Sequence, residues 1–251
     1  LLKKQIFLWA LKQKKGSVFH LIADVVVFNT IRRHFGGRLR LAISGGASLN
    51  ENLGKFFSNI GIQILEGYGL TETSPVIATN RQREYVFSSV GKPVTGVMVK
   101  INGDKEILVK GDNVFQGYYK DEALTREAFT GDGWFLTGDL GFIDTHGFLT
   151  IIGRKKDMFV LSGGKNIWPE PIENVLNEDK FIWQSMVIGS DQKFVSALIV
   201  PDWEEIALAL PKIAKLDRVA LATHPAVTAI IQKRIDEKIN PYARASSALF
   251  T

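Results

Sequence analysis

Residues 39–65 constrain the fold most, because two short apolar runs enclose a glycine-rich turn and a helix. Residues 39–43 form the first run, and the turn Ser44-Gly45-Gly46-Ala47 follows it. Gly61 ends the helix and residues 62–65 form the second run. The apolar face of the helix consists of Leu49, Leu53, Phe56, Phe57 and Ile60. Strand, turn, helix and strand in this order predict a parallel crossover, with ligands at the carboxyl ends of its strands.

The hydrophobic pattern differs before and after this crossover. Ahead of it, the spacing of apolar residues predicts helices over residues 6–11 and 18–35. From about residue 86 to residue 150 short β runs alternate with glycine turns, and the expected elements are strands at 97–101, 106–109 and 148–152 and a helix at 121–129. After Gly153 the expected elements are a hairpin, a helix at 170–176, strands at 186–188 and 195–200, and helices near 202–210 and 225–239.

These changes of pattern predict an α/β plus α+β chain with two domains. Residues 1–152 are expected to form part of a large, doubly wound α/β domain up to about residue 85, followed by a small, mainly β subdomain from 86 to 152. Residues 153–251 are expected to form a small α+β domain. The boundary is placed in the charged segment 153–157.

Composition excludes several classes of site. The chain has no cysteine and four scattered histidines, so disulfides, thiol nucleophiles and cysteine or histidine metal centres are not expected. A reducing cytoplasm is the expected compartment. The longest apolar stretch, residues 18–28, is interrupted by His20 and Asp24 and is shorter than the roughly 20 residues of a membrane span. The chain starts with Leu1, which suggests a piece cut from a longer protein.

Positive charge is concentrated near the start of the chain. The first 60 residues hold 10 Lys and Arg against 2 Asp and Glu, whereas the whole chain has a net charge of +5. Such a segment can bind nucleic acid, an anionic membrane surface or an anionic substrate, or it can be a solvated helix face. Charge by itself does not choose among these.

The stretch from Glu66 to Ser74 is a polar, two-glycine segment after an apolar strand, and it is expected to be a loop. Exposed backbone N–H groups and the hydroxyls of Thr71, Thr73 and Ser74 can cradle a phosphate, and Glu72 can hold Mg²⁺ beside it. The string Tyr68-Gly69-Leu70-Thr71-Glu72-Thr73 resembles the nucleotide-binding motif of the adenylate-forming superfamily. This superfamily includes acyl-CoA synthetases, luciferases and the adenylation domains of peptide synthetases.

Two further segments resemble signatures of the same superfamily, in the same order. Residues 133–141 (GWFLTGDLG) are similar to its second signature, and residues 153–158 with 162–169 are similar to its hinge and the start of its mobile C-terminal domain. The resemblance implies catalytic roles for Thr71 and Glu72, Glu72 also holding the metal, and a pivot at Lys156. It implies a nucleotide and CoA site at Gly45, Gly46, Ala47, Glu66, Gly67, Tyr68, Gly69, Thr71, Asp139, Arg154, Gly163 and Gly164.

Within that site the resemblance assigns separate tasks. Asp139 would bind the ribose hydroxyls, with about 1.5–3 kcal/mol for each charged hydrogen bond. Arg154 would contact ribose or phosphate, and Gly163 and Gly164 would pass close to the pantetheine arm of CoA. The adenine and the acyl chain would lie along the turn at 44–47, with Glu66, Gly67 and Tyr68 completing the adenine site. Alternatively, Tyr68 is an aromatic residue of the core.

Residues 33–40, 44–47 and 164–169 look most like those of bacterial long-chain fatty-acyl-CoA synthetases. The implied reaction consumes a fatty acid, ATP and CoA with Mg²⁺, and peripheral contact with an anionic membrane would fit it, whereas nucleic acid has no place in it. A fatty-acyl-AMP or aryl-acid ligase, or a non-catalytic nucleotide-binding module, remains an alternative. The family's phosphate loop and its C-terminal glycine-lysine motif are not found, so the C-terminal domain is expected to be truncated and the isolated chain not to make acyl-CoA.

Overall fold

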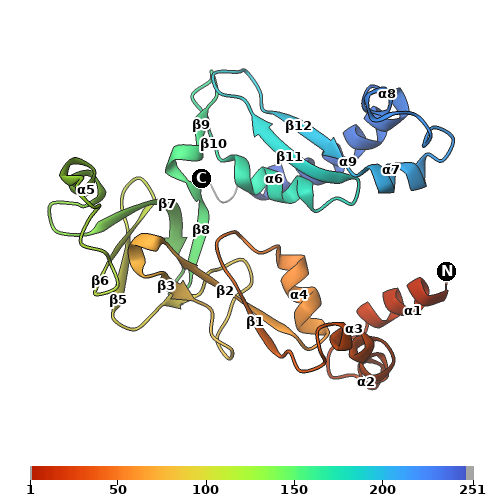
Figure 1. The fold of residues 1–251 in the computed structure, drawn as a ribbon, viewed down its shortest axis with the longest axis horizontal. Helices are drawn as coiled ribbons and strands as arrows, with labels where there is room; N and C mark the ends of the chain where they lie inside the picture. Colours follow the sequence, from red (N-terminus) through yellow and green to blue (C-terminus); the bar gives the residue numbers. More distant parts are fainter. Residues whose placement is uncertain (1, 247–251) are drawn as a thin grey trace. The chain divides into compact units, whose positions relative to one another are not determined.

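The computed structural model describes residues 2–246, with side chains up to residue 239, and forms two compact units. Unit 1 ends at Ile151 and unit 2 begins at Ile152. Figure 1 labels helices and strands of both units. Within the described residues, none of the helices is both long enough and apolar enough to cross a bilayer.

Unit 1 begins with helices that share one apolar cluster. They are α1 (Leu2–Leu11), α2 (Val18–Ala23), the π-helical turn η1 (Asp24–Phe28) and α3 (Asn29–His34). The side chain of Ser17 starts α2 by accepting a hydrogen bond from the backbone N–H of His20 at 3.1 Å. The helix predicted over residues 18–35 therefore forms, but with a π-helical turn in its middle. The buried cluster consists of Ala10, Ala23, Phe28, Ile60 and Ile62.

The predicted crossover is confirmed. It consists of β1 (Leu41–Ser44), α4 (Glu51–Asn59) and β2 (Gln63–Gly69), and β1 pairs with β2 in parallel. Asn50 caps α4 by accepting a hydrogen bond from the N–H of Leu53 at 2.9 Å. Two antiparallel strands, β3 (Val76–Thr79) and β4 (Lys92–Pro93), complete a mixed sheet in the order β1-β2-β3-β4.

Strand β2 is longer than predicted, and this corrects the expectation of a loop beginning at Glu66. The residues up to Gly69 stay in the strand because β3 returns alongside them, with Gly67 opposite Thr79 and Tyr68 opposite Ala78. The strand that pairs with these residues, β3, comes later in the chain, so the glycines of the segment by themselves wrongly predict a loop.

The rest of unit 1 is the predicted mainly β region. Its elements are β5 (Val97–Ile101), β6 (Glu106–Gly111), α5 (Glu122–Ala128), β7 (Phe135–Ile143) and β8 (Leu149–Arg154), which runs on into unit 2. The strands form a sheet in the order β5-β6-β7-β8 over a core of Ile77, Ala78, Ile107, Val109 and Leu149. The sequence did not predict β7, because Gly138 and Gly141 interrupt its apolar pattern. Asp139 consequently lies in a strand.

Unit 2 has the predicted α+β order. Its elements are η3 (Lys155–Asp157), β9 (Phe159–Val160), β10 (Asn166–Ile167), α6 (Pro169–Asn177), β11 (Ile182–Ile188), β12 (Ser196–Pro201), α7 (Trp203–Ala209), α8 (Arg218–Ala222) and α9 (Pro225–Ser246). Strand β11 starts earlier than predicted, and α8 was not predicted. The hairpin β9–β10 and the pair β11–β12 are both antiparallel.

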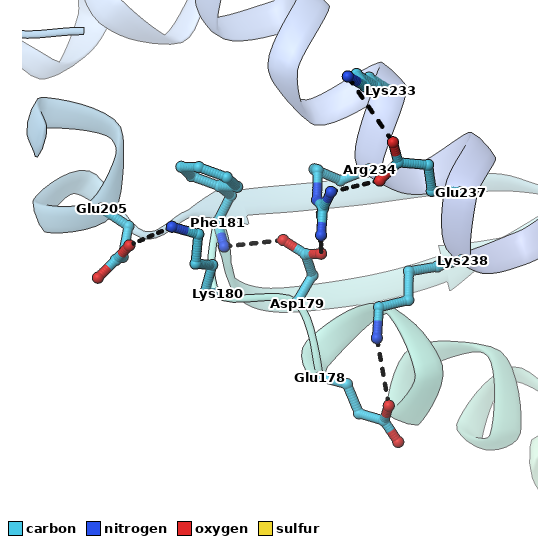
Figure 2. A network of polar contacts seen from close by, with 9 residues as sticks. All are labelled: Glu178, Asp179, Lys180, Phe181, Glu205, Lys233, Arg234, Glu237 and Lys238. Atoms are coloured by element: carbon cyan, nitrogen blue, oxygen red, sulfur yellow. Dashed lines mark hydrogen bonds and ion pairs between the residues drawn. The ribbon is translucent and has the colours of Figure 1, made fainter. Parts of the chain in front are cut away.

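A polar network ties α9 to the turn between α6 and β11 (Figure 2). The Asp179 side chain is 1% exposed, and its Oδ2 lies 2.8 Å from both Nε and Nη2 of Arg234. Its Oδ1 accepts a hydrogen bond from the N–H of Phe181 at 3.0 Å. Burial raises the pKa of Asp179, but the Arg234 and Phe181 hydrogen bonds together hold that pKa below its ordinary value.

Candidate functional site

The turn after β1 and the middle of β2 lie against each other at the predicted adenine residues. Ser44 pairs with Glu66, and a Cβ placed on Gly45 would come within 3.3 Å of the carbonyl oxygen of Gly67. The Glu66 side chain is buried, and its Oε1 accepts a hydrogen bond from the N–H of Leu49 at 3.1 Å. Burial raises the pKa of Glu66, and the Leu49 hydrogen bond opposes that shift.

The contact between Glu66 and Leu49 ties the far end of the turn to β2. Gly46 and Ala47, between these anchors, are exposed. Gly46 has a φ of +86°, a conformation that L side chains rarely adopt. The turn can therefore present backbone to a flat ligand beside the end of β2.

Tyr68 and Asp139 join two of the sequence motifs directly. The Tyr68 hydroxyl donates a hydrogen bond to Oδ2 of Asp139 at 2.6 Å, across 71 residues of sequence. Asp139 is 4% exposed, and its own N–H donates to Oγ1 of Thr137 at 3.1 Å. A buried carboxylate that accepts hydrogen bonds has a fixed orientation, so the end of β2 and the middle of β7 form one rigid polar site.

The turn after β2 depends on a glycine at position 69. A Cβ there would lie 1.6 Å from the carbonyl oxygen of Pro75, which no rotation of a side chain could relieve. The turn continues as η2 (Thr71–Thr73). Thr73 is fully buried, and its hydroxyl accepts from the N–H of Leu70 at 3.0 Å and donates to the Pro75 carbonyl at 2.8 Å. The expectation that Thr73 can hold a phosphate is therefore wrong, whereas Thr71 and Ser74 are exposed.

Glu72 is held by residues that the sequence did not single out. The Tyr118 hydroxyl donates to Oε1 of Glu72 at 3.1 Å, and the N–H of Phe115 donates to its carbonyl oxygen at 2.8 Å. Nearby, Nδ2 of Asn113 donates to the carbonyl oxygens of Thr73 at 2.9 Å and Val76 at 3.0 Å. The sequence shows a tyrosine at position 118 but gives no sign of its contact with Glu72, because the two residues are 46 positions apart.

No group of three acidic or histidine side chains that could enclose a metal ion is found among the described residues. Glu72 is half-buried, and Thr71 beside it in η2 is exposed.

The remaining predicted residues belong to unit 2. Arg154 is the half-buried last residue of β8, and Lys156 is exposed in η3. Gly163 and Gly164 are exposed in the turn between β9 and β10, where Gly164 has a φ of +81°. The N–H of Gly164 closes the turn by donating to the carbonyl oxygen of Leu161 at 2.8 Å. The roles of these four residues remain predictions.

Comparison with known proteins identifies the family. Residues 8–119 match the model of the AMP-binding enzymes, and residues 156–241 match the model of the AMP-binding enzyme C-terminal domain. The chain resembles O-succinylbenzoate coenzyme A synthetase of Bacillus subtilis, solved in complex with ATP and magnesium ion. The TM-score is 0.59 and the identity 31%, and the match covers 65% of this chain and 37% of the other.

Curated relatives are longer than this chain. The long-chain-fatty-acid–CoA ligase FadD15 of Mycobacterium bovis is 46% identical over 185 residues, which is 74% of this chain and 31% of that protein. The chloroplastic long-chain-fatty-acid–[acyl-carrier-protein] ligase AEE15 of Arabidopsis thaliana is 36% identical over 217 residues, covering 78% of this chain and 30% of that protein. The chain therefore spans under a third of the length of these two relatives. Together with the two family models, they confirm the resemblance drawn from the motifs: the chain belongs to the AMP-binding enzyme family.

Proposed function

We propose that this chain is part of an AMP-forming ligase that activates a long-chain fatty acid and transfers it to CoA. The observation that carries the proposal is the hydrogen bond between Tyr68 and Asp139, because it brings together two motifs that each resemble a nucleotide-binding signature. The name of the mycobacterial relative, which matches 74% of this chain, supports the choice of fatty acid and CoA.

In this proposal the nucleoside lies along the end of β2. Asp139 accepts hydrogen bonds from the ribose hydroxyls, and Tyr68 both orients that carboxylate and offers its ring to the adenine. Glu66, Gly67 and the turn at Gly45–Ala47 border the base. The resemblance implies that Arg154 contacts ribose or phosphate, a task that its positive charge suits.

The phosphates and Mg²⁺ are assigned to Thr71 and Glu72. Mg²⁺ is commonly held by one or two carboxylates together with water and substrate phosphates, so a single glutamate beside an exposed threonine fits such an ion. When bound, the ion would neutralise charge that develops at the α-phosphate. Glu72 would hold it, and the Thr71 hydroxyl would donate to a phosphate oxygen.

Two chemical steps follow from the proposed activity. A carboxylate oxygen of the fatty acid bonds to the α-phosphorus of ATP while the bond to pyrophosphate breaks, giving acyl-AMP. The thiol sulfur of CoA then bonds to the acyl carbon and its proton passes to solvent, while the bond from the acyl carbon to the phosphate oxygen breaks and AMP leaves. The residues of this chain bind and orient the nucleotide in both steps, and Gly163 and Gly164 let the backbone pass close to the pantetheine arm of CoA.

Binding of AMP tests the nucleotide site. We expect Asp139→Ala to weaken AMP binding by the chain about ten- to a hundredfold, as charged hydrogen bonds contribute about 1.5–3 kcal/mol each. Asp132→Ala is the matched control, because the Asp132 side chain is 66% exposed in the loop before β7. Equal affinity of the Asp139 variant and the parent would remove Asp139 from the site.

Product analysis tests the acceptor. In the complete protein that contains this chain, acyl-CoA formed only when CoA is present supports the proposed ligase, whereas acyl-AMP as the end product would identify an acyl-AMP ligase. The Arabidopsis relative, named as an acyl-carrier-protein ligase, makes that protein acceptor a necessary third arm. AMP binding by the complete protein without ATP–pyrophosphate exchange would favour a non-catalytic nucleotide-binding module.

We also propose that the helices of unit 1 contact an anionic membrane surface. Large apolar side chains on α2 and η1 are exposed, and exposed lysines precede them; these are Val18, Phe19, Leu21, Ile22, Val25 and Val26, and Lys12, Lys14 and Lys15. Each well-placed lysine would contribute about 1 kcal/mol near anionic lipid. Vesicle co-sedimentation that is indifferent to anionic lipid and to salt would reject this contact.

A further inference from the structure

The segment from Asn113 to Tyr118 binds the turn that carries Glu72. Asn113 holds the carbonyl oxygens of Thr73 and Val76, and Phe115 holds the carbonyl oxygen of Glu72. These bonds fix the backbone of the turn from the side of the β subdomain. None of the sequence motifs includes this segment.

Tyr118 adds a contact to the side chain of Glu72. Its hydroxyl donates to Oε1 at 3.1 Å, and no other described side chain hydrogen-bonds the Glu72 carboxylate. A carboxylate can only accept hydrogen bonds, so the Tyr118 hydroxyl is the donor in this contact.

The ring of Tyr118 is itself held in place. It packs edge-on against Phe115, with ring centroids 4.8 Å apart and planes at 73°, and Phe115 stacks on Phe129 at 5.7 Å. The backbone N–H of Tyr118 donates to Oγ1 of Thr125 at 2.9 Å. An anchored ring gives the hydroxyl one position, which restricts the rotamers open to the flexible Glu72 side chain.

We propose that Tyr118 is a positioning residue, whose hydroxyl engages one oxygen of the Glu72 carboxylate and so presents the other to a nucleotide-bound Mg²⁺. The inference rests on the proposed nucleotide function and deepens it, because it explains how the Glu72 carboxylate is oriented toward an ion. Outer partners of metal ligands act in this way in other sites, where their loss typically lowers affinity about 10–100-fold.

The test compares Tyr118→Phe with Tyr119→Phe. Both remove one hydroxyl, but Tyr119 is 88% exposed and its ring contacts Lys120. We expect Tyr118→Phe to raise the Mg²⁺ concentration needed for half-maximal ATP binding about tenfold, with AMP affinity in the absence of Mg²⁺ unchanged. Tyr119→Phe is expected to leave both quantities unchanged. A merely structural role of Tyr118 would weaken AMP and ATP binding alike without changing the Mg²⁺ dependence, and that result would overturn the proposal.

A double variant separates failure of this inference from failure of the proposed function. If Tyr118 acts through Glu72, then Tyr118→Phe has no further effect on Mg²⁺ dependence once Glu72→Gln is present. Independent effects of the two changes would refute the positioning role while leaving the nucleotide site intact. If the parent chain binds AMP but shows no Mg²⁺ dependence with ATP, the role of Glu72 and this inference both fall. If the parent chain binds neither nucleotide, the proposed function fails with them.

Discussion

The pair of Asp179 and Arg234 predicts an unequal loss of stability when either partner is removed. Asp179 is 1% exposed at its side chain, whereas Arg234 is 31% exposed. Arg234→Ala leaves a buried carboxylate with the Phe181 N–H but without the cation that hydrogen-bonds it, and we expect unit 2 to lose about 3–5 kcal/mol. Asp179→Asn keeps an acceptor for Phe181 and frees an arginine that can turn toward water, so we expect a loss of about 1–2 kcal/mol.

Hydrogen exchange read on peptides of unit 2 measures these changes separately from unit 1. Lys233→Ala is the matched control, because Lys233 precedes Arg234 on α9, is 73% exposed and lies 3.9 Å from Glu237. It should cost less than about 1 kcal/mol. A larger loss for Asp179→Asn than for Arg234→Ala would refute the reasoning, since it would mean that the buried carboxylate is not the group that depends on its partner.

The pH dependence of this pair has a definite sign. The pKa of Asp179 is lowered in the folded state, so the pair contributes its full stability above the ordinary aspartate pKa of about 3.9. That stability is lost as the pH falls through the lower folded-state value. In Asp179→Asn the acid-induced loss of protection in unit 2 should be smaller than in the parent.

Three further predictions concern other parts of the chain. Gly69→Ala forces its Cβ against the Pro75 carbonyl and should cost more than about 2 kcal/mol in urea unfolding, whereas Gly103→Ala meets no atom within 4 Å and should cost little. Because the pKa of Glu66 is raised by burial, unit 1 should lose stability as pH rises from about 4.3 through the folded-state value, and Glu66→Gln should abolish that loss. In the complete protein containing this chain, Lys156→Pro should slow thioester formation more than acyl-AMP formation; equal slowing of the two steps would contradict a pivot at this position.

The parts of the fold that are encoded locally could be predicted from the sequence. The crossover from β1 through α4 to β2 follows from apolar spacing, a glycine-rich turn and a terminating glycine, all within about 30 residues. Strand β7 could not be predicted in this way, because its glycines interrupt the alternation of apolar residues. Pairing with β6 holds this segment in an extended conformation. The same holds for the end of β2, where β3 supplies the partner.

Some residues of the candidate site could likewise be predicted from the sequence, and others could not. Tyr68, Glu72 and Asp139 lie in strings distinctive enough to be recognised from sequence. Tyr118 does not, because its importance depends on a contact with Glu72 across 46 residues. The hydroxyl of Thr73 was misassigned, because sequence cannot tell that the turn uses it internally.

The outer edge of β1 favours self-association of the chain in solution. Among the described strands β1 pairs only with β2, so its other edge offers unpaired backbone groups, flanked by Leu41 at 38% and Ile43 at 73% exposure. Such an edge is a template for strand addition and self-association. Arg38 and Arg40, both exposed, precede the strand and act as charged gatekeepers against it. Salt screens charges of this kind, so self-association of the chain should begin at a higher protein concentration when the ionic strength is low.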